Sequence, residues 1–164
     1  MAASLRVGRL LGTSLRAGWI ATRGYSNGAS MIPLTFGSPY ESFYDNVNVK
    51  QVDVSATTGS FGILPDHVPA VSVLKPGLVT IYEDDNKTVK YFASSGTVTI
   101  NTDSTVQILA EEAVPLDRLD AQAARTGLEK CQQKLTSSSS EQDRAEANIG
   151  VELYEAMLKA LEGN

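Results

Sequence analysis

The sequence predicts an α+β fold in which an N-terminal antiparallel β-sandwich is followed by a C-terminal antiparallel α-helical hairpin. Before Pro115, valine, isoleucine and aromatic residues recur at every second position in short runs separated by turn residues, which is typical of strands with one buried face. After Pro115 the apolar residues recur at helical spacing. We therefore expect a leader over residues 1–25, a β-sandwich over residues 26–115 and a helical hairpin over residues 116–164.

The leader has the composition of a mitochondrial transit peptide. Residues 1–25 contain no Asp or Glu, and they carry four arginines among Ser, Thr, Ala and Leu. On a helical wheel the arginines gather opposite the apolar residues, and the polar residues at 12–16 interrupt the apolar centre that a secretory signal needs. We expect cleavage after Tyr25. The alternative is an amphipathic helix that the mature protein keeps on a membrane surface.

Charge and composition exclude several classes of function. The sequence has 14 basic and 19 acidic side chains; loss of the four leader arginines leaves 10 basic ones and takes the formal net charge from −5 to −9, which opposes nucleic-acid binding. Cys131 is the single cysteine, so neither an internal disulfide nor a cysteine-rich zinc site can form. His67 is the single histidine, and no catalytic or nucleotide-binding fingerprint occurs. We therefore predict no catalytic residue, no cofactor and no metal site, and no apolar run is long enough to span a membrane.

The strands of the β half are indicated by alternating apolar residues and by the turns between them. Alternation is clearest at residues 47–49, 52–54, 89–91, 98–100 and 106–108. Between Val49 and Val52 the alternation slips by one residue, which predicts a β-bulge at Lys50-Gln51.

A strand, a turn and a second strand are predicted over residues 71–82. Val71 and Val73 alternate with small or polar neighbours, as expected for a strand that buries these two valines. Lys75-Pro76-Gly77-Leu78 then fits a type II turn, with proline second and glycine third. The chain is expected to pair back along the strand that follows.

Residues 59–67 are predicted to form a tight, exposed loop, because two glycines flank Phe61 and a proline follows them. Loops usually lie on the surface, and an exposed aromatic side chain is a common anchor at protein interfaces. The candidate interface residues are Ser60, Phe61, Ile63, Leu64 and His67. Two alternatives remain open: Ile63 packs into the sandwich core, and His67 is hydrogen-bonded within its own loop.

Two apolar stripes after Pro115 predict two amphipathic helices. The first stripe contains Leu116, Leu119, Ala123, Leu128, Cys131 and Leu135. The second stripe contains Ala145, Ile149, Leu153, Ala156, Met157 and Ala160. Residues 136–140 are polar and predict the connecting turn, and Asp117 and Asp120 lie where carboxylates stabilise a helix N-terminus. Because the stripes are rich in alanine, we expect the hairpin to bury little area and to depend on a partner surface.

Several motifs occur in a fixed order along the β half. They are Gly62-Ile63-Leu64-Pro65 with His67, Pro69 and Leu74, then Pro76-Gly77, Phe92-Ala93-Ser94-Ser95-Gly96 and Leu109-Ala110-Glu111-Glu112-Ala113-Val114. Together they resemble the signature of one family, the mitochondrial delta subunits and the bacterial and chloroplast epsilon subunits of F-type ATP synthases. The resemblance covers nearly all of the chain after residue 30, and it implies a flattened sandwich followed by a helical hairpin.

The resemblance implies a non-catalytic rotor subunit of the central stalk. Such a subunit links the gamma subunit to the c-ring and couples proton-driven rotation to ATP synthesis, with the small mitochondrial epsilon subunit as a further partner. Its location would be the matrix face of the mitochondrial inner membrane, peripheral to the membrane. The alternative function is a free-standing matrix β-sandwich that binds a small ligand.

One departure from the family pattern bears on nucleotide binding. Bacterial members can bind ATP through a motif of Ile or Leu, Asp, two variable residues, Arg and Ala. This chain reads Leu116-Asp117-Arg118-Leu119-Asp120-Ala121, with Asp120 in place of the arginine. A carboxylate repels a triphosphate, so we predict no tight binding of ATP.

Overall fold

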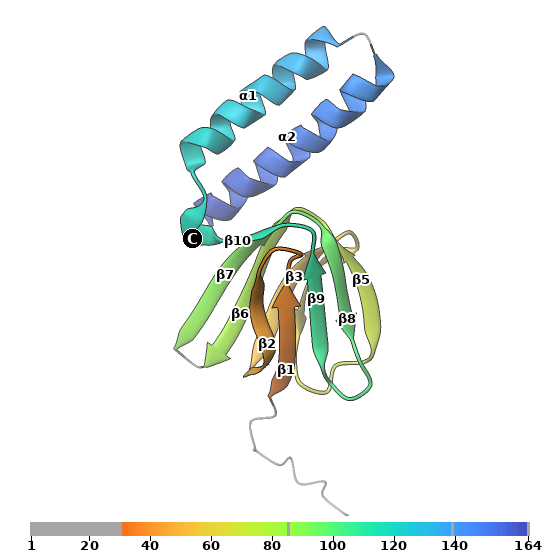
Figure 1. Ribbon diagram of the computed structural model, residues 1–164, viewed down its shortest axis with the longest axis vertical. Coiled ribbons are helices and arrows are strands. Elements are labelled where there is room, and N and C mark those ends of the chain that lie inside the picture. Colours follow the sequence, from red (N-terminus) through yellow and green to blue (C-terminus); the bar gives the residue numbers. More distant parts are fainter. Residues whose placement is uncertain (1–30, 85, 139, 164) are drawn as a thin grey trace, which may run out of the picture.

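The computed structural model describes residues 31–84, 86–138 and 140–163; the predicted transit peptide and its cleavage site lie outside the described residues. All strands precede both α-helices, so the predicted order of sandwich and hairpin is confirmed (Figure 1). The elements are β1 (Ile32–Gly37), β2 (Ser42–Val49), β3 (Gln51–Ala56), β4 (Gly59–Ile63), β5 (Ala70–Leu74), β6 (Gly77–Asp84), β7 (Lys87–Ala93), β8 (Gly96–Ile100), β9 (Val106–Ala110), β10 (Ala113–Pro115), a 3₁₀ turn (Leu116–Arg118), α1 (Ala121–Ser137) and α2 (Glu141–Glu162).

The strands form one sheet in the order β10-β7-β6-β3-β5-β8-β9-β1-β2, and β4 pairs with β3. A single bridging pair, Ala56 with Leu74, joins β3 to β5, and at this narrow link the sheet folds over into two layers. One layer contains β4, β3, β6, β7 and β10, and the other contains β5, β8, β9, β1 and β2. Neighbouring described strands run antiparallel, except that β1 and β9 run parallel.

The two layers enclose a core of large apolar side chains. Alternate positions of the strands supply it, because successive side chains on a strand point to opposite faces. Three rings, Phe36, Phe43 and Tyr91, pack together with centroids 4.8 to 5.2 Å apart. The largest fully buried members of this core are Phe36, Ile32, Leu34, Ile63, Ile81, Ile108, Val49, Val52, Val54, Val79 and Val98.

The predicted bulge at Lys50-Gln51 is wrong. Val49 ends β2 and Gln51 begins β3, and the chain passes here from one layer of the sandwich to the other. The direction that faces the core reverses between the layers, so Val49 and Val52 are both buried although they lie three positions apart. The N–H of Lys50 donates to the carbonyl oxygen of Tyr82 at 2.8 Å and ties the crossing to β6.

The predicted type II turn at residues 75–78 is also wrong. That turn requires a positive φ at its third residue, and Gly77 does not have one. Glycine is needed at this position for a different reason, since an added Cβ would lie 2.8 Å from the Cβ and Oγ of Ser55 on β3. Gly77 therefore permits β6 to start in close contact with β3.

The connection between the helices is shorter than the predicted turn at residues 136–140. Helix α1 continues through Ser137, and α2 begins at Glu141. The hydroxyl groups of Thr136 and Ser137 donate to the carbonyl oxygen of Gln133 at 2.9 and 2.8 Å, which supports the last turn of α1. These polar residues extend the helix instead of breaking it.

The two helices approach each other through small residues. A Cβ added to Gly127 would lie 2.4 Å from Cζ of Tyr154, and one added to Gly150 would lie 2.6 Å from Sγ of Cys131. Cys131 is half-buried in this contact, in agreement with its predicted place on an apolar stripe. Close packing of this kind requires that positions 127 and 150 lack a side chain.

The hairpin rests on one end of the sandwich (Figure 1). Its contact with the strands is a small second cluster built around Phe92, Leu116 and Ala160. Half-buried side chains from both sides complete this cluster: Leu78, Val114, Leu119, Leu153, Ala156, Met157 and Leu161. The start of β1 lies at the opposite end of the sandwich, together with the β8–β9 turn.

Candidate functional site

Residues 59–63 form strand β4, whereas the sequence predicted an exposed loop there. The turn consists of Thr57 and Thr58, and Gly59 then adopts a φ of +128°, a conformation that glycine tolerates far better than other residues. At Gly62 the backbone needs space, because an added Cβ would lie 2.8 Å from Oδ1 of Asp53 on β3. Both glycines thus serve the β3–β4 hairpin.

The five predicted interface residues are distributed over three environments. Ile63 is fully buried in the core, which is the alternative that the sequence left open, and Phe61 is half-buried against the same core. Ser60 is exposed beside α2. Leu64 and His67 belong to the loop between β4 and β5, at the end of the sandwich away from the hairpin.

His67 has hydrogen-bond partners within its own loop, as the second open alternative stated. Its Nδ1 lies 2.8 Å from the carbonyl oxygen of Val68, and its backbone N–H donates to the carbonyl oxygen of Leu64 at 3.2 Å. Its ring lies 6.3 Å from that of Phe61, measured between centroids. In this loop Leu64 and Val68 remain exposed.

Exposed apolar side chains of β5 and β9 lie on either side of two threonines of β8, and we name this surface the outward apolar face. Val71 and Val73 are 69% and 56% exposed, so the prediction that they face the core is wrong. Val73 lies opposite Thr97, and Thr97 lies opposite Leu109, which is 68% exposed. Residues directly opposite in neighbouring strands share a face, so this face lies on the outside of one layer.

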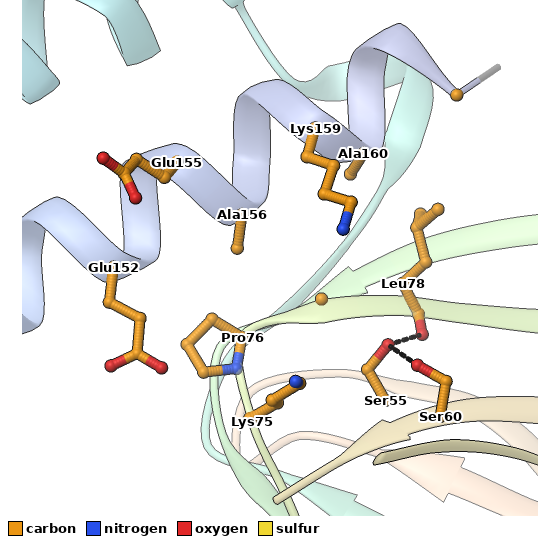
Figure 2. Close-up of a pocket in the computed structure, with 12 residues that line it drawn as sticks. Ser55, Ser60, Lys75, Pro76, Leu78, Glu152, Glu155, Ala156, Lys159 and Ala160 are labelled. Atoms are coloured by element: carbon orange, nitrogen blue, oxygen red, sulfur yellow. Dashed lines mark hydrogen bonds between the residues drawn. The ribbon is translucent and has the colours of Figure 1, made fainter.

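A groove of about 590 Å³ lies between α2 and the sandwich, and we name it the α2 groove. On its floor the hydroxyl of Ser55 donates to the carbonyl oxygen of Leu78 at 3.3 Å and lies 3.5 Å from the hydroxyl oxygen of Ser60. Figure 2 shows Lys159 pointing from α2 into the groove and Glu155 pointing away from it. The remaining lining residues are Lys75, Pro76, Gly77, Glu152, Ala156, Ala160 and Gly163.

The outer side of α2 continues this groove toward the tip of the hairpin. Ile149 is 68% exposed and Ala145 is exposed, so the prediction that they belong to a buried stripe is wrong. The buried positions of α2 are Ala147 and Ala160. Ile149 lies three residues before Glu152, close to one turn of helix, so a large apolar side chain and a carboxylate are neighbours on this surface.

Asp120 caps the first α-helix. Its Oδ1 accepts hydrogen bonds from the N–H groups of Gln122 at 2.8 Å and Ala123 at 3.2 Å. An aspartate at this position satisfies two amide groups that the helix itself leaves unpaired. The residue that replaces the arginine of the bacterial ATP motif therefore has a structural role in this chain.

A polar chain joins the two layers at the edge of the sandwich. The hydroxyl of Tyr44 on β2 donates to Oε1 of Glu83 on β6 at 2.7 Å, and Glu83 forms an ion pair with Lys87. Burial, followed by the bond to Glu83, raises the pKa of Tyr44. The hydrogen bonds from Lys87 and then Tyr44 lower the pKa of Glu83. This chain closes the seam between β2 and β6 where no backbone ladder joins them.

Two classes of site are not found in the part of the chain that the structure describes. Over residues 31–84, 86–138 and 140–163, no group of three or more His, Cys, Asp and Glu side chains could hold a metal ion. Over the same residues, no helix combines the length and the apolar character that a membrane crossing requires.

Family models match both halves of the chain. The model of the ATP synthase delta/epsilon chain, β-sandwich domain, matches residues 31–116. The model of the C-terminal domain of the metazoan delta subunit of F1F0-ATP synthase matches residues 119–160. The two matches meet where the strands end and the helices begin.

Individual relatives are similar over most of their length. The mitochondrial ATP synthase subunit delta of Caenorhabditis elegans is 40% identical over 148 residues, which cover 86% of this chain and 90% of the relative. The corresponding subunit of Neurospora crassa is 33% identical over 163 residues, which cover 96% of this chain and 98% of the relative. A chain in the Euglena gracilis mitochondrial ATP synthase structure, which contains OSCP, F1 and the c-ring, superimposes with a TM-score of 0.76 at 28% identity and covers 85% of this chain and 87% of that chain.

Proposed function

The chain belongs to the family of ATP synthase delta and epsilon subunits, and on this premise we propose that it links the gamma subunit to the c-ring and couples proton-driven rotation to ATP synthesis. It is a mitochondrial, non-catalytic subunit of the rotary complex. The observation that carries the proposal is a fully packed sandwich with separate surfaces on its outward face, at its far end and beside α2. A close-packed body transmits force between partners with little deformation.

The outward apolar face is our proposed contact with gamma. Val71, Val73 and Leu109 form an exposed apolar patch, and such patches on soluble proteins mark interaction sites. Permanent interfaces are more apolar than transient ones. A subunit that links gamma to the c-ring has to stay bound to gamma during rotation, so its interface with gamma has to be permanent. Thr97, between Val73 and Leu109, and Thr99, between Val71 and Gln107, add hydrogen-bonding groups without charge.

The loops at the end away from the hairpin are our proposed contact with the c-ring. These loops combine the exposed apolar side chains Leu64 and Val68 with polar groups. In the β8–β9 turn, Oδ1 of Asp103 accepts from the backbone N–H and the hydroxyl of Thr105, at 3.1 and 2.7 Å, which fixes the turn. A fixed polar surface of this kind is suited to the polar loops of a membrane ring. We assign the interface role that the sequence predicted for Leu64 and His67 to this proposed contact with the c-ring.

The α2 groove is our proposed contact with the small epsilon subunit. The groove brings together Ser60 and Lys75 from the sandwich with Glu152 and Ala156 from α2, so one partner held there touches both halves of the chain. Ile149 supplies a large exposed apolar side chain next to the groove. A partner seated here would fix the hairpin, whose own contact with the sandwich is small.

The test of the proposal is copurification from mitochondria. We expect the tagged mature chain to bring down gamma, the c-ring and the small epsilon subunit, with ATPase activity. The double substitution Val71→Lys and Val73→Lys places two charges on the outward apolar face, and we expect it to lose gamma while the chain stays folded. Val47→Lys is the matched control, because Val47 is exposed on β2, outside that face.

Two results would count against the proposal. Equal recovery of gamma by the double variant and the control would exclude the outward apolar face as the gamma contact. A wild-type chain that stays monomeric and copurifies with no ATPase activity would exclude the rotor function and favour the free-standing sandwich that binds a small ligand.

A further inference from the structure

Three strands of the described sheet, β2, β4 and β10, pair with a single neighbour, and two of them are protected against pairing with another chain. In β2 the pairing with β1 shifts register twice, and Asn46 has a φ of +53°. Strand β10 has three residues and ends at Pro115, which lacks an N–H group. Irregularity, shortness and proline are the usual devices that prevent a free edge from accepting another strand.

Strand β4 has none of these protections. Its five residues pair with β3 in an unbroken register from Gly59 to Ile63, and its sequence, Gly-Ser-Phe-Gly-Ile, contains neither charge nor proline. Ser60 and Gly62 are exposed and carry almost no side chain. In an edge strand, alternate residues direct their N–H and C=O groups away from the paired neighbour. No other described strand pairs with these groups of β4.

We propose that the free edge of β4 accepts an extended segment of the subunit that occupies the α2 groove, and that this segment adds a strand to the sheet. The identity of that subunit rests on the proposed function above. Strand addition gives affinity through main-chain hydrogen bonds, and it needs an accessible, regular edge.

The position of Ser60 connects the edge to the groove. Ser60 belongs to β4, and its hydroxyl oxygen lies 3.5 Å from that of Ser55 on the groove floor. A segment that leaves the groove past Ser60 therefore meets the free edge of β4 directly.

The chemistry around the edge indicates which segment fits. The carboxylate of Asp53, beside Gly62, accepts hydrogen bonds from Nε2 of Gln51 at 2.6 Å and from the hydroxyl of Tyr82 at 3.1 Å. Glu152 adds a second carboxylate at the groove wall. Because Lys75 and Lys159 line the groove together with Glu152, we expect the segment to be extended, with small side chains opposite Ser60 and a basic side chain near Asp53.

Amide hydrogen exchange, resolved by residue, tests the proposal in the assembled protein. The free chain is compared with its complex with the gamma and small epsilon subunits. We expect alternate amides of β4 that exchange quickly in the free chain to become protected in the complex, because only every second N–H points outward. Unchanged exchange at every β4 amide in a complex that has formed would overturn strand addition and leave the proposed function intact. A complex that does not form would overturn the proposed function instead.

A pair of lysine substitutions gives the second test. Ser60→Lys places a long charged side chain on the exposed strand, whereas Thr58→Lys places the same charge in the adjacent turn. We expect Ser60→Lys to weaken binding of the small epsilon subunit about tenfold and Thr58→Lys to leave it within about twofold. Both variants should melt at the temperature of the wild-type chain. Equal affinities of the two folded variants would overturn the proposal.

Discussion

The sandwich and the hairpin of this chain are held together by different means. The sandwich core contains large β-branched and aromatic side chains that are fully buried between two layers. In the hairpin the buried positions of the two α-helices are all alanines, namely Ala124, Ala147 and Ala160. Burial of an alanine removes little apolar area from water, so the hairpin depends on close approach of its backbones and on helix capping.

This difference indicates which part deforms first under load. The side chains of the sandwich core form one buried cluster between the two layers, so a local shift would disturb many contacts at once. The hairpin touches the sandwich through the small cluster around Phe92, Leu116 and Ala160. We therefore expect the sandwich to be the stiff part of the subunit and the hairpin to be the part that deforms first.

The largest effect is expected from a truncation in the sandwich core. Phe36 is fully buried and packs against Phe43 and Tyr91. Phe36→Ala should lower the free energy of unfolding by about 3–5 kcal/mol, measured by denaturant titration. Leu128→Ala is the comparison in the hairpin, where the side chain is only half-buried. A loss at Leu128 as large as that at Phe36 would contradict the difference drawn between the two regions.

A smaller and local effect is expected at the helix contact. Gly127→Val places side-chain atoms where the ring of Tyr154 lies, so the helices must separate, at a cost of about 1–3 kcal/mol. Amide exchange should rise in α1 and α2 and stay unchanged in the strands. Adding Tyr154→Ala should make the cost of Gly127→Val smaller, because the clash is removed. If the losses of stability caused by Gly127→Val and Tyr154→Ala simply add in the double variant, the contact between position 127 and the ring of Tyr154 is not tight.

Loss of the helix cap should have a still smaller effect. Asp120→Ala removes the acceptor for the N–H groups of Gln122 and Ala123 and should destabilise α1 by about 1 kcal/mol. Asp120→Asn is the control, because its side-chain oxygen can accept the same bonds. The helical signal in circular dichroism during thermal melting measures both variants. Equal losses in the two variants would argue against a capping role.

The smallest effect concerns the pH dependence of the sandwich. The pKa of Glu83 is lowered from its ordinary value of 4.5, so the folded state favours the carboxylate. Its contribution to stability is present above pH 4.5 and is lost as the pH falls through the lower pKa of the folded state. Glu83→Gln should reduce the slope of stability against pH in this acidic range. The effect is small because the site is partly exposed, and an unchanged slope would show that the pair with Lys87 contributes nothing.

Much of the fold follows from local patterns, because the buried set of each strand repeats at every second residue. Val52, Val54, Val98 and Ile100 were predicted in this way and are buried. The same pattern cannot decide which of two alternating sets faces inward when both are plausible. In β5 the decision comes from β8, because Ser72 lies directly opposite the buried Val98. Val71 and Val73 must then point outward.

The candidate surfaces were harder to predict, because a local pattern does not show which side of an element another element covers. Ile149 fits an apolar stripe at helical spacing, but the side of α2 that faces α1 is set by Gly150, which lies against Cys131. The α2 groove exists because α2 returns to the sandwich, an arrangement that no local pattern contains. The glycines at 59 and 62 indicated an unusual backbone correctly, although the element they serve is a hairpin strand instead of a loop.

The parallel pairing of β1 with β9 constrains the order in which this protein acquires its structure. Leu34 lies opposite Val106, so the first strand of the sandwich finds this neighbour only after about seventy more residues have become available. Contacts between such distant parts of a chain form slowly. When the chain leaves a ribosome or a translocation pore N-terminus first, β1 can pair with β2 at once. The other edge of β1 then has no partner strand until β9 emerges. We expect the sandwich to close late and in one step, and chaperones to bind the apolar strands until then.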